Sequence, residues 1–263
     1  MIKIALYQYQ IEWENKEANF DKLLKVCEKA HEQKVELLLL PEMSFSGFSM
    51  NTEHTAVEPE VIVSSVQEIS KKYNLYIGFG WVKKSSLKCK NHYSIVGPNG
   101  LLSDYEKIHP FSYSKENDYF EGGNNISSFY LKGIPFTSFI CYDLRFPEIF
   151  QLASKKTHVV IVPACWPKKR AEHWKCLLQA RAIENQSYIL AVNCVGNIGG
   201  LDYSGDSRVI NPDGQIVAMS ETGKEELLIY NLEDDVEEYR EAFPVKKDRK
   251  EKLYEELRHE CSR

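Results

Sequence analysis

The chain has 263 residues, is 43% hydrophobic and carries a formal net charge of −5. This length and apolar content are sufficient for one domain with a large core. The negative charge gives no basic footprint for nucleic acid or an anionic membrane, and no apolar stretch approaches the roughly 20 residues that span a bilayer. We therefore expect a compact protein that acts on neither nucleic acid nor a membrane.

Seven cysteines are scattered along the chain without a Cys-x-x-Cys pair. An odd and scattered set argues against a disulfide framework and a structural zinc site, and it favours a reducing compartment. The nearest approach to metal-ligand spacing is Cys165, His173 and Cys176, which we interpret as core and helix-surface positions. Residues 1–15 alternate apolar and polar side chains and lack the apolar core of a signal peptide. These features predict a cytoplasmic protein with no metal and no cofactor.

Strand and helix signals alternate along the chain without a linker or a low-complexity break. Residues 18–33 have helical spacing and predict a surface helix, with an apolar stripe made of Phe20, Leu23, Leu24 and Cys27. Residues 74–82 predict a strand. Residues 89–107 predict two strands joined at Pro98-Asn99-Gly100, which is a strong hairpin sequence.

Two residues suited to catalysis follow predicted strands in this first half. Residues 35–40 (VELLLL) predict a fully buried strand, and Glu42 comes where that strand ends. Lys107 follows a short strand-like run in residues 101–117. In α/β proteins the chemistry of a site lies at the carboxyl ends of strands. Taken alone, however, Glu42 is equally consistent with a loop or cap residue, and Lys107 with a surface charge.

Cys141 stands at the end of a third buried strand, FTSFI (residues 136–140). The pattern then turns through Tyr142 and Asp143 into an amphipathic stretch, FPEIFQLASKK, that predicts a helix. A nucleophile on such a turn projects above the sheet, where backbone N–H groups and a helix N-terminus favour a thiolate and stabilise an oxyanion. The alternative for a single cysteine is a buried structural thiol.

Glu42, Lys107 and Cys141 together supply what a cysteine acyl-transfer site needs. A carboxylate acts as general base for the thiol and later for water. An ammonium stabilises the negative charge of the tetrahedral intermediate. None of the seven histidines stands in a motif beside Cys141, and none is needed when a glutamate carries the proton.

The second half continues the alternation. Residues 157–167 predict a buried strand that ends near the site, and residues 172–186 predict a helix. Residues 207–220 predict a hairpin about Pro212-Asp213-Gly214. From about residue 233 onward the chain is dense in charge, which is typical of a solvated helical tail or of a tail that packs on a partner subunit. We interpret residues 1–263 as a single domain that ends in this tail.

Three motifs resemble the Glu–Lys–Cys signature of the nitrilase superfamily of carbon–nitrogen hydrolases in order and spacing. They are PEMSFSGF, YEKIH and ICYDLRFPE. Residues 4–30 resemble that family's first strand and helix, and residues 172–196 and 205–217 resemble its later half, so the resemblance covers nearly the whole chain. It implies an α/β fold, an α-β-β-α sandwich with four layers in the protomer, and a homodimer formed through helices.

The resemblance also implies roles for individual residues. Glu42 matches the family's general base, Lys107 its catalytic lysine and Cys141 its nucleophile. Glu116 matches a second glutamate that positions substrate and lysine. The backbone N–H of Tyr142 matches the oxyanion hole, together with the Lys107 ammonium.

Within the superfamily, residues 164–174 (ACWPKKRAEHW) are similar to the Trp-Pro-x-x-Arg-x-x-His-Trp run of bacterial omega-amidases. These enzymes hydrolyse the terminal amide of α-keto acid amides such as 2-oxoglutaramate. Cys165 replaces the usual Asn or Gln before Trp166. We expect a cysteine amidase for a small carboxylate-bearing amide, with Trp166 and Arg170 as substrate-binding candidates. Arg170 either binds the substrate carboxylate or is a solvent-facing member of its basic cluster.

Alternatives to this expectation stay open. One is an amidase for deaminated glutathione or another amide, because that branch shares the CYD-x-RFPE element but lacks the Trp-Pro run. Another is transfer of the acyl group to an acceptor other than water, which uses the same residues. The third is a non-catalytic scaffold, which has no reason to keep all of Glu42, Lys107 and Cys141.

Overall fold

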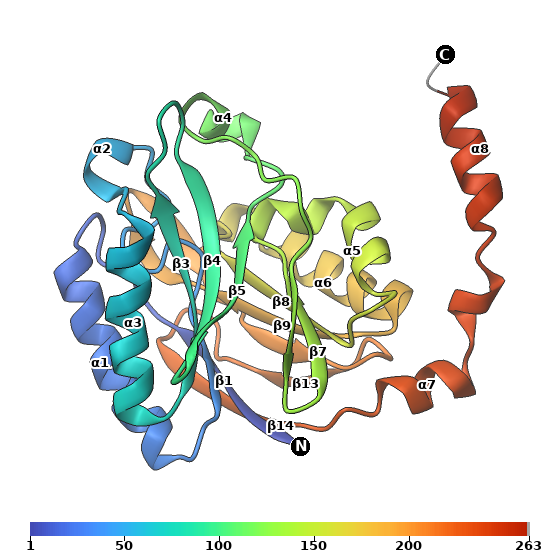
Figure 1. Ribbon diagram of the computed structural model, residues 1–263, viewed down its shortest axis with the longest axis horizontal. Coiled ribbons are helices and arrows are strands. Elements are labelled where there is room, and N and C mark those ends of the chain that lie inside the picture. The colour runs from blue at the N-terminus through green and yellow to red at the C-terminus, as the bar shows by residue number, and fades with distance from the viewer. Residues whose placement is uncertain (262–263) are drawn as a thin grey trace.

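Two layers of β-sheet form the centre of the protein. The computed structural model describes residues 1–261, and within these residues the strands form two six-stranded sheets (Figure 1). The first sheet has the strand order β14-β1-β2-β3-β4-β5, and the second has the order β13-β12-β9-β8-β7-β6. Of the predicted C-terminal tail, residues 262–263 lie outside the described residues.

The strands of the first sheet are β1 (Ile2–Gln8), β2 (Leu37–Leu39), β3 (Tyr76–Lys83), β4 (Lys90–Gly97), β5 (Gly100–Glu106) and β14 (Glu226–Leu232). Those of the second are β6 (Ser128–Leu131), β7 (Ile134–Ser138), β8 (Val159–Ala164), β9 (Tyr188–Asn193), β12 (Arg208–Ile210) and β13 (Ile216–Met219). A separate hairpin joins β10 (Val195–Ile198) and β11 (Leu201–Ser204). The two predicted hairpins are confirmed as β4–β5 and β12–β13.

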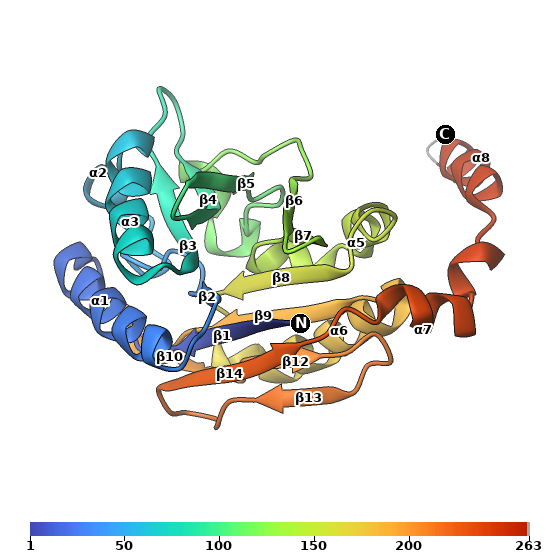
Figure 2. The same ribbon diagram turned by 60° about the horizontal axis from the view of Figure 1, so that its bottom comes forward.

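Helices cover the outer face of each sheet (Figure 2). α1 (Lys16–Glu32) and α3 (Pro59–Tyr73) lie on the first sheet, and α5 (Pro147–Ala153) and α6 (Ala171–Asn185) lie on the second. The predicted α/β class and the four-layer α-β-β-α sandwich are therefore confirmed. Among residues 1–261, the helices are all too short or too polar to cross a membrane.

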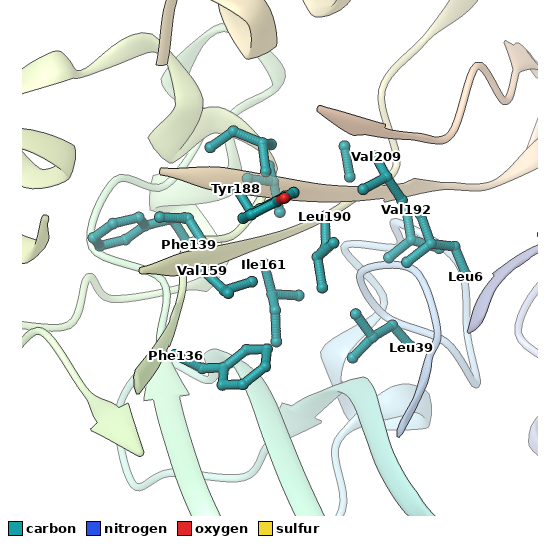
Figure 3. Close-up of a cluster of buried hydrophobic side chains, with 14 of the residues drawn as sticks. Leu6, Leu39, Phe136, Phe139, Val159, Ile161, Tyr188, Leu190, Val192 and Val209 are labelled. Atoms are coloured by element: carbon teal, nitrogen blue, oxygen red, sulfur yellow. The ribbon is translucent and has the colours of Figure 1, made fainter. Parts of the chain in front are cut away.

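Apolar side chains fill the space between the two sheets, and Figure 3 shows Leu39 and Leu6 opposite Ile161 and Leu190 there. The run of leucines at 37–40 is buried because β2 is covered on both faces. Leu37 and Leu39 join the cluster between the sheets, whereas Leu38 and Leu40 join the cluster beneath α1 and α3. Each such side chain contributes about 1.5–3 kcal/mol when it leaves water.

The central strands of each sheet run parallel, which brings their carboxyl ends to one edge. β1, β2 and β3 are parallel neighbours in the first sheet, as are β7, β8 and β9 in the second. Residues that follow parallel strands therefore meet at that edge. Glu42 follows β2, Cys141 follows β7, and Trp166 follows β8.

The buried face of α1 differs from the predicted stripe in one position. Leu23 and Cys27 are fully buried, but Leu24 is 37% exposed, so its assignment to the stripe is wrong. The buried face continues instead through Val26 and Ala30, one helical turn on. Asn19 shares this face, because its side chain bonds the backbone of the preceding loop and of Phe45.

The charged C-terminal segment forms two helices, of which the first packs on the sandwich and the second extends beyond it. α7 (Val236–Ala242) stays on the body, where Val236 is fully buried and Arg240 donates to three backbone carbonyls. α8 (Glu251–Cys261) projects away from the sheets (Figure 1). Its side chains Leu253, Tyr254 and Leu257 are 43–45% exposed.

Candidate active site

Cys141 lies on a sharp turn between β7 and α5. Its backbone φ is 47°, in the left-handed region that residues other than glycine seldom adopt. Residues Cys141–Arg145 form a short 3₁₀ helix, η2, and α5 begins at Pro147. The thiol side chain is buried but lines a cavity. The strand-to-helix turn that the sequence predicts is therefore confirmed.

Asp143 holds this turn in place. Its carboxylate is fully buried, and Oδ2 accepts the Ile140 N–H at 3.0 Å and the Tyr105 hydroxyl at 2.8 Å. Oδ1 accepts the His109 N–H at 3.0 Å and contacts His109 Nδ1 at 2.8 Å. A left-handed cysteine persists only where its surroundings over-determine it. Asp143 supplies that constraint and joins the turn to the segment after β5.

Lys107 lies between two buried carboxylates. Its Nζ is 2.9 Å from Glu42 Oε1, and it is 3.0 Å and 2.9 Å from Glu116 Oε1 and Oε2. The three side chains are 0–1% exposed. Burial alone lowers the pKa of Lys107, but Glu116 and Glu42 outweigh it and raise that pKa well above its usual value. Burial raises the pKa of Glu116, and Glu42 adds to this while Lys107 opposes it. The lysine is therefore a permanent cation.

Cys141 rests as a neutral thiol. Burial and the neighbouring Glu42 raise the pKa of this thiol well above its usual value, and Lys107 only partly opposes them. The expectation that the turn favours a thiolate is therefore wrong for the resting site, because desolvation and a carboxylate outweigh the backbone dipoles. A nucleophile in this state needs a base to remove its proton, and Glu42 is the carboxylate beside it.

Two further groups bind the Glu42 carboxylate. Its Oε2 accepts the backbone N–H of Cys165 at 2.9 Å. Its Oε1 accepts from Asn91 Nδ2 at 2.8 Å, and the same nitrogen lies 3.2 Å from Glu116 Oε1. Sequence reasoning missed Asn91, because its neighbours in β4, Lys90 and His92, are also polar and nothing in the strand singles it out. Glu42 is thus fixed by donors from three separate parts of the chain.

A cavity of about 280 Å³ opens in front of these groups. The sequence-predicted residues Lys107, Cys141, Tyr142, Trp166 and Arg170 all line it. Tyr142 comes in the first turn of η2, where leading backbone N–H groups have no acceptor within the helix. The indole of Trp166 donates to its own loop, at the Arg170 carbonyl, 2.8 Å away.

Two guanidinium groups enter this cavity. Arg170 lies over the rings of Phe111 and Tyr113, with its Cζ 5.3 Å from each centroid. Arg145 lies 4.8 Å from the Trp166 ring centroid. Burial lowers the pKa of Arg145, and nearby Arg170 adds to this. Neither guanidinium has a carboxylate within 4.0 Å among the described residues. Sequence reasoning missed Arg145, although it lies inside the motif ICYDLRFPE.

Cys165, His173 and Cys176, which we interpret from the sequence as core and helix-surface positions, do not form a metal site. Cys165 is buried in the core beside Cys194, whereas Cys176 is exposed on α6. Within residues 1–261, no three His, Cys, Asp or Glu side chains are grouped so that they could hold a metal ion. The cysteines whose side chains are described are free thiols: Cys27, Cys89, Cys141, Cys165, Cys176 and Cys194.

Comparison with known proteins gives the same result as the motifs and the fold. The family model for carbon-nitrogen hydrolases matches residues 3–241. The chain is 32% identical over 252 residues to omega-amidase YafV of Escherichia coli K12, covering 94% of this chain and 96% of that protein. It is 33% identical over 259 residues to 2-oxoglutaramate amidase of Bacillus subtilis, covering 95% and 98%.

Among solved structures, the chain is similar to XC1258 from Xanthomonas campestris, described as a CN-hydrolase superfamily protein with an arsenic adduct in the active site. The TM-score is 0.89 at 28% identity, and the match covers 94% of this chain and 97% of that one. The chain therefore belongs to the carbon–nitrogen hydrolase family, the nitrilase superfamily. It is an enzyme that hydrolyses amides, which confirms the family resemblance.

Proposed function

We propose that this enzyme cleaves the terminal amide of a small carboxylate-bearing amide, of the α-keto acid class, to the acid and ammonia. One observation carries the proposal: one cavity is lined by a thiol, by an ammonium that contacts the buried base Glu42, and by two guanidiniums without carboxylate partners. The similarity to two omega-amidase-type proteins supports the same substrate class.

Acylation begins at the Cys141 thiol. Glu42 takes the thiol proton while the sulfur attacks the amide carbon, and a tetrahedral intermediate forms. The Lys107 ammonium and the Tyr142 N–H donate to its oxygen. Collapse breaks the carbon–nitrogen bond, Glu42 gives its proton to the leaving nitrogen, and ammonia departs. A thioester on Cys141 remains.

Deacylation uses the same groups on water. Glu42 takes a proton from a water molecule as the oxygen attacks the thioester, and the oxyanion again rests on Lys107 and the Tyr142 N–H. Collapse breaks the carbon–sulfur bond, and the proton on Glu42 returns to the Cys141 sulfur. Glu116 holds Lys107 in place throughout, since both of its oxygens lie within 3.0 Å of Nζ. Water is the acceptor in this scheme.

The substrate carboxylate binds to Arg170 and Arg145, which line the same cavity. A guanidinium binds a carboxylate through a planar pair of N–H donors, which gives direction as well as charge. None of the described side chains that line the cavity is acidic, so an anionic substrate meets no competing carboxylate there. Trp166 supplies an apolar wall and supports Arg145.

We also propose that residues 1–263 form a single domain, with a charged tail from about residue 233, and that the chain acts as a homodimer. α5 and α6 expose Leu152 and Ile183 at 54% and 55% on the outer face of the second sheet. The apolar side chains of α8 are also uncovered. A second copy that covers these helices buries both sets. The free thiols support a reducing, cytoplasmic location. Sedimentation of the wild type and of Leu152→Glu tests the dimer, which the variant should weaken.

Ammonia release from a panel of amides tests the proposed reaction. The panel contains 2-oxoglutaramate, 2-oxosuccinamate, deaminated glutathione, glutamine and a simple nitrile. We expect the highest kcat/KM with an α-keto acid amide and no turnover of the nitrile. A preference for deaminated glutathione would assign the enzyme to the deaminated-glutathione amidases instead. A preference for glutamine would contradict the proposed α-keto acid substrate class.

A further inference from the structure

Asn91 lies between the two buried carboxylates of the site. It belongs to β4 and is 2% exposed. Its Nδ2 donates to Glu42 Oε1 at 2.8 Å and to Glu116 Oε1 at 3.2 Å. Its backbone carbonyl accepts the Lys107 N–H at 2.9 Å. One uncharged residue therefore contacts three members of the charged cluster.

Only the nitrogen end of the Asn91 side-chain amide has hydrogen-bond partners among the described residues. Ionised carboxylates accept hydrogen bonds and cannot donate, so the NH₂ end of the amide must face them. The Oδ1 end is buried and has no hydrogen-bond partner among the described residues. A buried amide that serves packing alone has partners at both ends as a rule. The unpartnered oxygen indicates that the amide is present for the carboxylates.

The charge balance of the cluster explains why a neutral donor is useful. Glu42 and Glu116 are both within 3.0 Å of one ammonium, so the ionised cluster has two negative charges and one positive charge. Two like charges in a buried site favour uptake of a proton by one of them. Lys107 Nζ already has three carboxylate oxygens within 3.0 Å as acceptors for its three hydrogens. When Lys107 turns one of them toward a substrate oxygen, the carboxylates lose a donor.

We propose that Asn91 is a positioning residue that keeps Glu42 and Glu116 ionised and aligned while Lys107 engages the substrate oxygen. The proposal rests on the roles given above to Glu42 and Lys107. A hydrogen bond to the charged form of a carboxylate favours that form. Without the amide, the carboxylate pair loses a donor and takes up a proton more readily, and a proton held on Glu42 prevents it from accepting the thiol proton. The loss of activity is therefore largest on the acidic side of the pH profile.

The other titratable groups around the two carboxylates do not titrate in the same range. Burial raises the pKa of the two thiols and of the tyrosine hydroxyl among them, and Lys107 stays charged. These groups are Lys107 after β5, Cys141 in η2, Cys165 after β8 and Tyr203 on β11. The acidic limb of the profile thus reports the carboxylates themselves.

The test compares Asn91→Ala with the wild type in two measurements across pH. One is kcat/KM for the best amide of the panel, and the other is the rate at which iodoacetamide alkylates Cys141, which needs no knowledge of the substrate. In the pH profiles of kcat/KM and of the alkylation rate, we expect the acidic limb to move to higher pH by about one unit. At a given pH on that limb, each rate then falls about tenfold. Both rates should approach the wild-type values at alkaline pH.

Tyr93→Phe is the matched control. Tyr93 lies on the same strand, is fully buried and donates its hydroxyl to the Leu40 carbonyl at 3.0 Å, away from the carboxylates. This variant should melt at a lower temperature with its acidic limb unmoved. Where Asn91→Ala does not fold, Asn91→Ser carries the same comparison. An unmoved limb with a uniform loss, or with no loss, overturns the proposal for Asn91.

Glu42→Gln separates this proposal from the proposed function. If Glu42→Gln removes the acidic limb of alkylation and Asn91→Ala leaves it unmoved, only the role of Asn91 is wrong. If Glu42→Gln leaves the limb unchanged, the base assignment itself is wrong, and the inference for Asn91 is overturned with it.

Discussion

Cys165 donates its backbone N–H to Glu42 Oε2 at 2.9 Å, and its thiol donates to the Glu42 carbonyl oxygen at 3.2 Å. Glu42 follows a strand of the first sheet, and Cys165 follows a strand of the second. The carboxylate is thus tied to the opposite sheet by main chain rather than by a side chain. Any residue except proline supplies that N–H, which explains how cysteine can stand where the resemblance expects Asn or Gln.

We predict that Cys165→Ala keeps most of the activity, because the N–H bond to Glu42 survives the change. Loss of the hydrogen bond from the Cys165 thiol should reduce kcat only a few-fold.

Cys141→Ala should abolish turnover while the protein stays folded, and Cys141→Ser should be nearly inactive because a hydroxyl is a much poorer nucleophile beside a carboxylate. Ammonia release measures the activity of the purified Cys165 and Cys141 variants, and circular dichroism measures whether they are folded. Substantial activity in Cys141→Ala would exclude the covalent route.

Substitutions of Glu42 and of Lys107 should lower kcat for different reasons. Glu42→Gln keeps the shape but removes the proton acceptor, so kcat should fall by on the order of 10²–10⁴-fold, the usual loss of general base catalysis. Lys107→Met should cost about 10²–10³-fold through lost stabilisation of the oxyanion. Single-turnover kinetics separates the steps, since Glu42→Gln should slow both formation and breakdown of the thioester. Unchanged formation in that variant contradicts its role as the base for the thiol.

Asp143 should be needed for the catalytic turn. Asp143→Ala leaves the Ile140 N–H, the His109 N–H and the Tyr105 hydroxyl without their acceptor in a buried place. Each unsatisfied buried donor costs about 1–3 kcal/mol, so we expect the free energy of unfolding to fall by several kcal/mol. Urea denaturation measures it. Asp143→Asn keeps one acceptor oxygen and should lose less, and equal losses in both variants would show that the hydrogen bonds are not the cause.

The sequence predicts the parts of this site that are local. The leucines at 37–40 and the apolar run before Cys141 are contiguous, so periodicity alone indicates buried strands that end at Glu42 and Cys141. The match to the family motifs then assigns Lys107 and Glu116 to the same site. Because parallel strands end at one edge, even the meeting of these residues follows from the predicted order of elements.

The partners that depend on packing between distant segments could not be predicted in the same way. Asn91 meets Glu42 across the first sheet, and nothing near it in the sequence marks that contact. The neutral state of Cys141 depends on burial, which a strand pattern does not measure. Leu24 looks like part of the buried stripe of α1 but lies at its edge, where a shift of a few tens of degrees decides exposure.

Recognition of the substrate carboxylate can be tested with the two arginines of the cavity. Arg170→Ala should raise KM for 2-oxoglutaramate by roughly 10- to 150-fold if one charged hydrogen bond of about 1.5–3 kcal/mol is lost. Arg145→Ala should act in the same direction. The double variant should show less than the sum of the two free-energy changes, because both side chains bind one carboxylate. Steady-state kinetics with purified variants gives these values.

Two controls decide whether charge recognition is the cause. An uncharged amide of similar length should be hydrolysed about equally by the wild type and by Arg170→Ala, since it has no carboxylate to lose. Lys169→Ala removes another cation that lines the same cavity. Its ammonium has no planar pair of donors, so the variant should raise KM less than Arg170→Ala does. Equal effects of Arg170→Ala on both amides, or a larger effect of Lys169→Ala, would transfer carboxylate recognition to other residues. Either outcome would weaken the choice of substrate class and leave the chemistry of Glu42, Lys107 and Cys141 untouched.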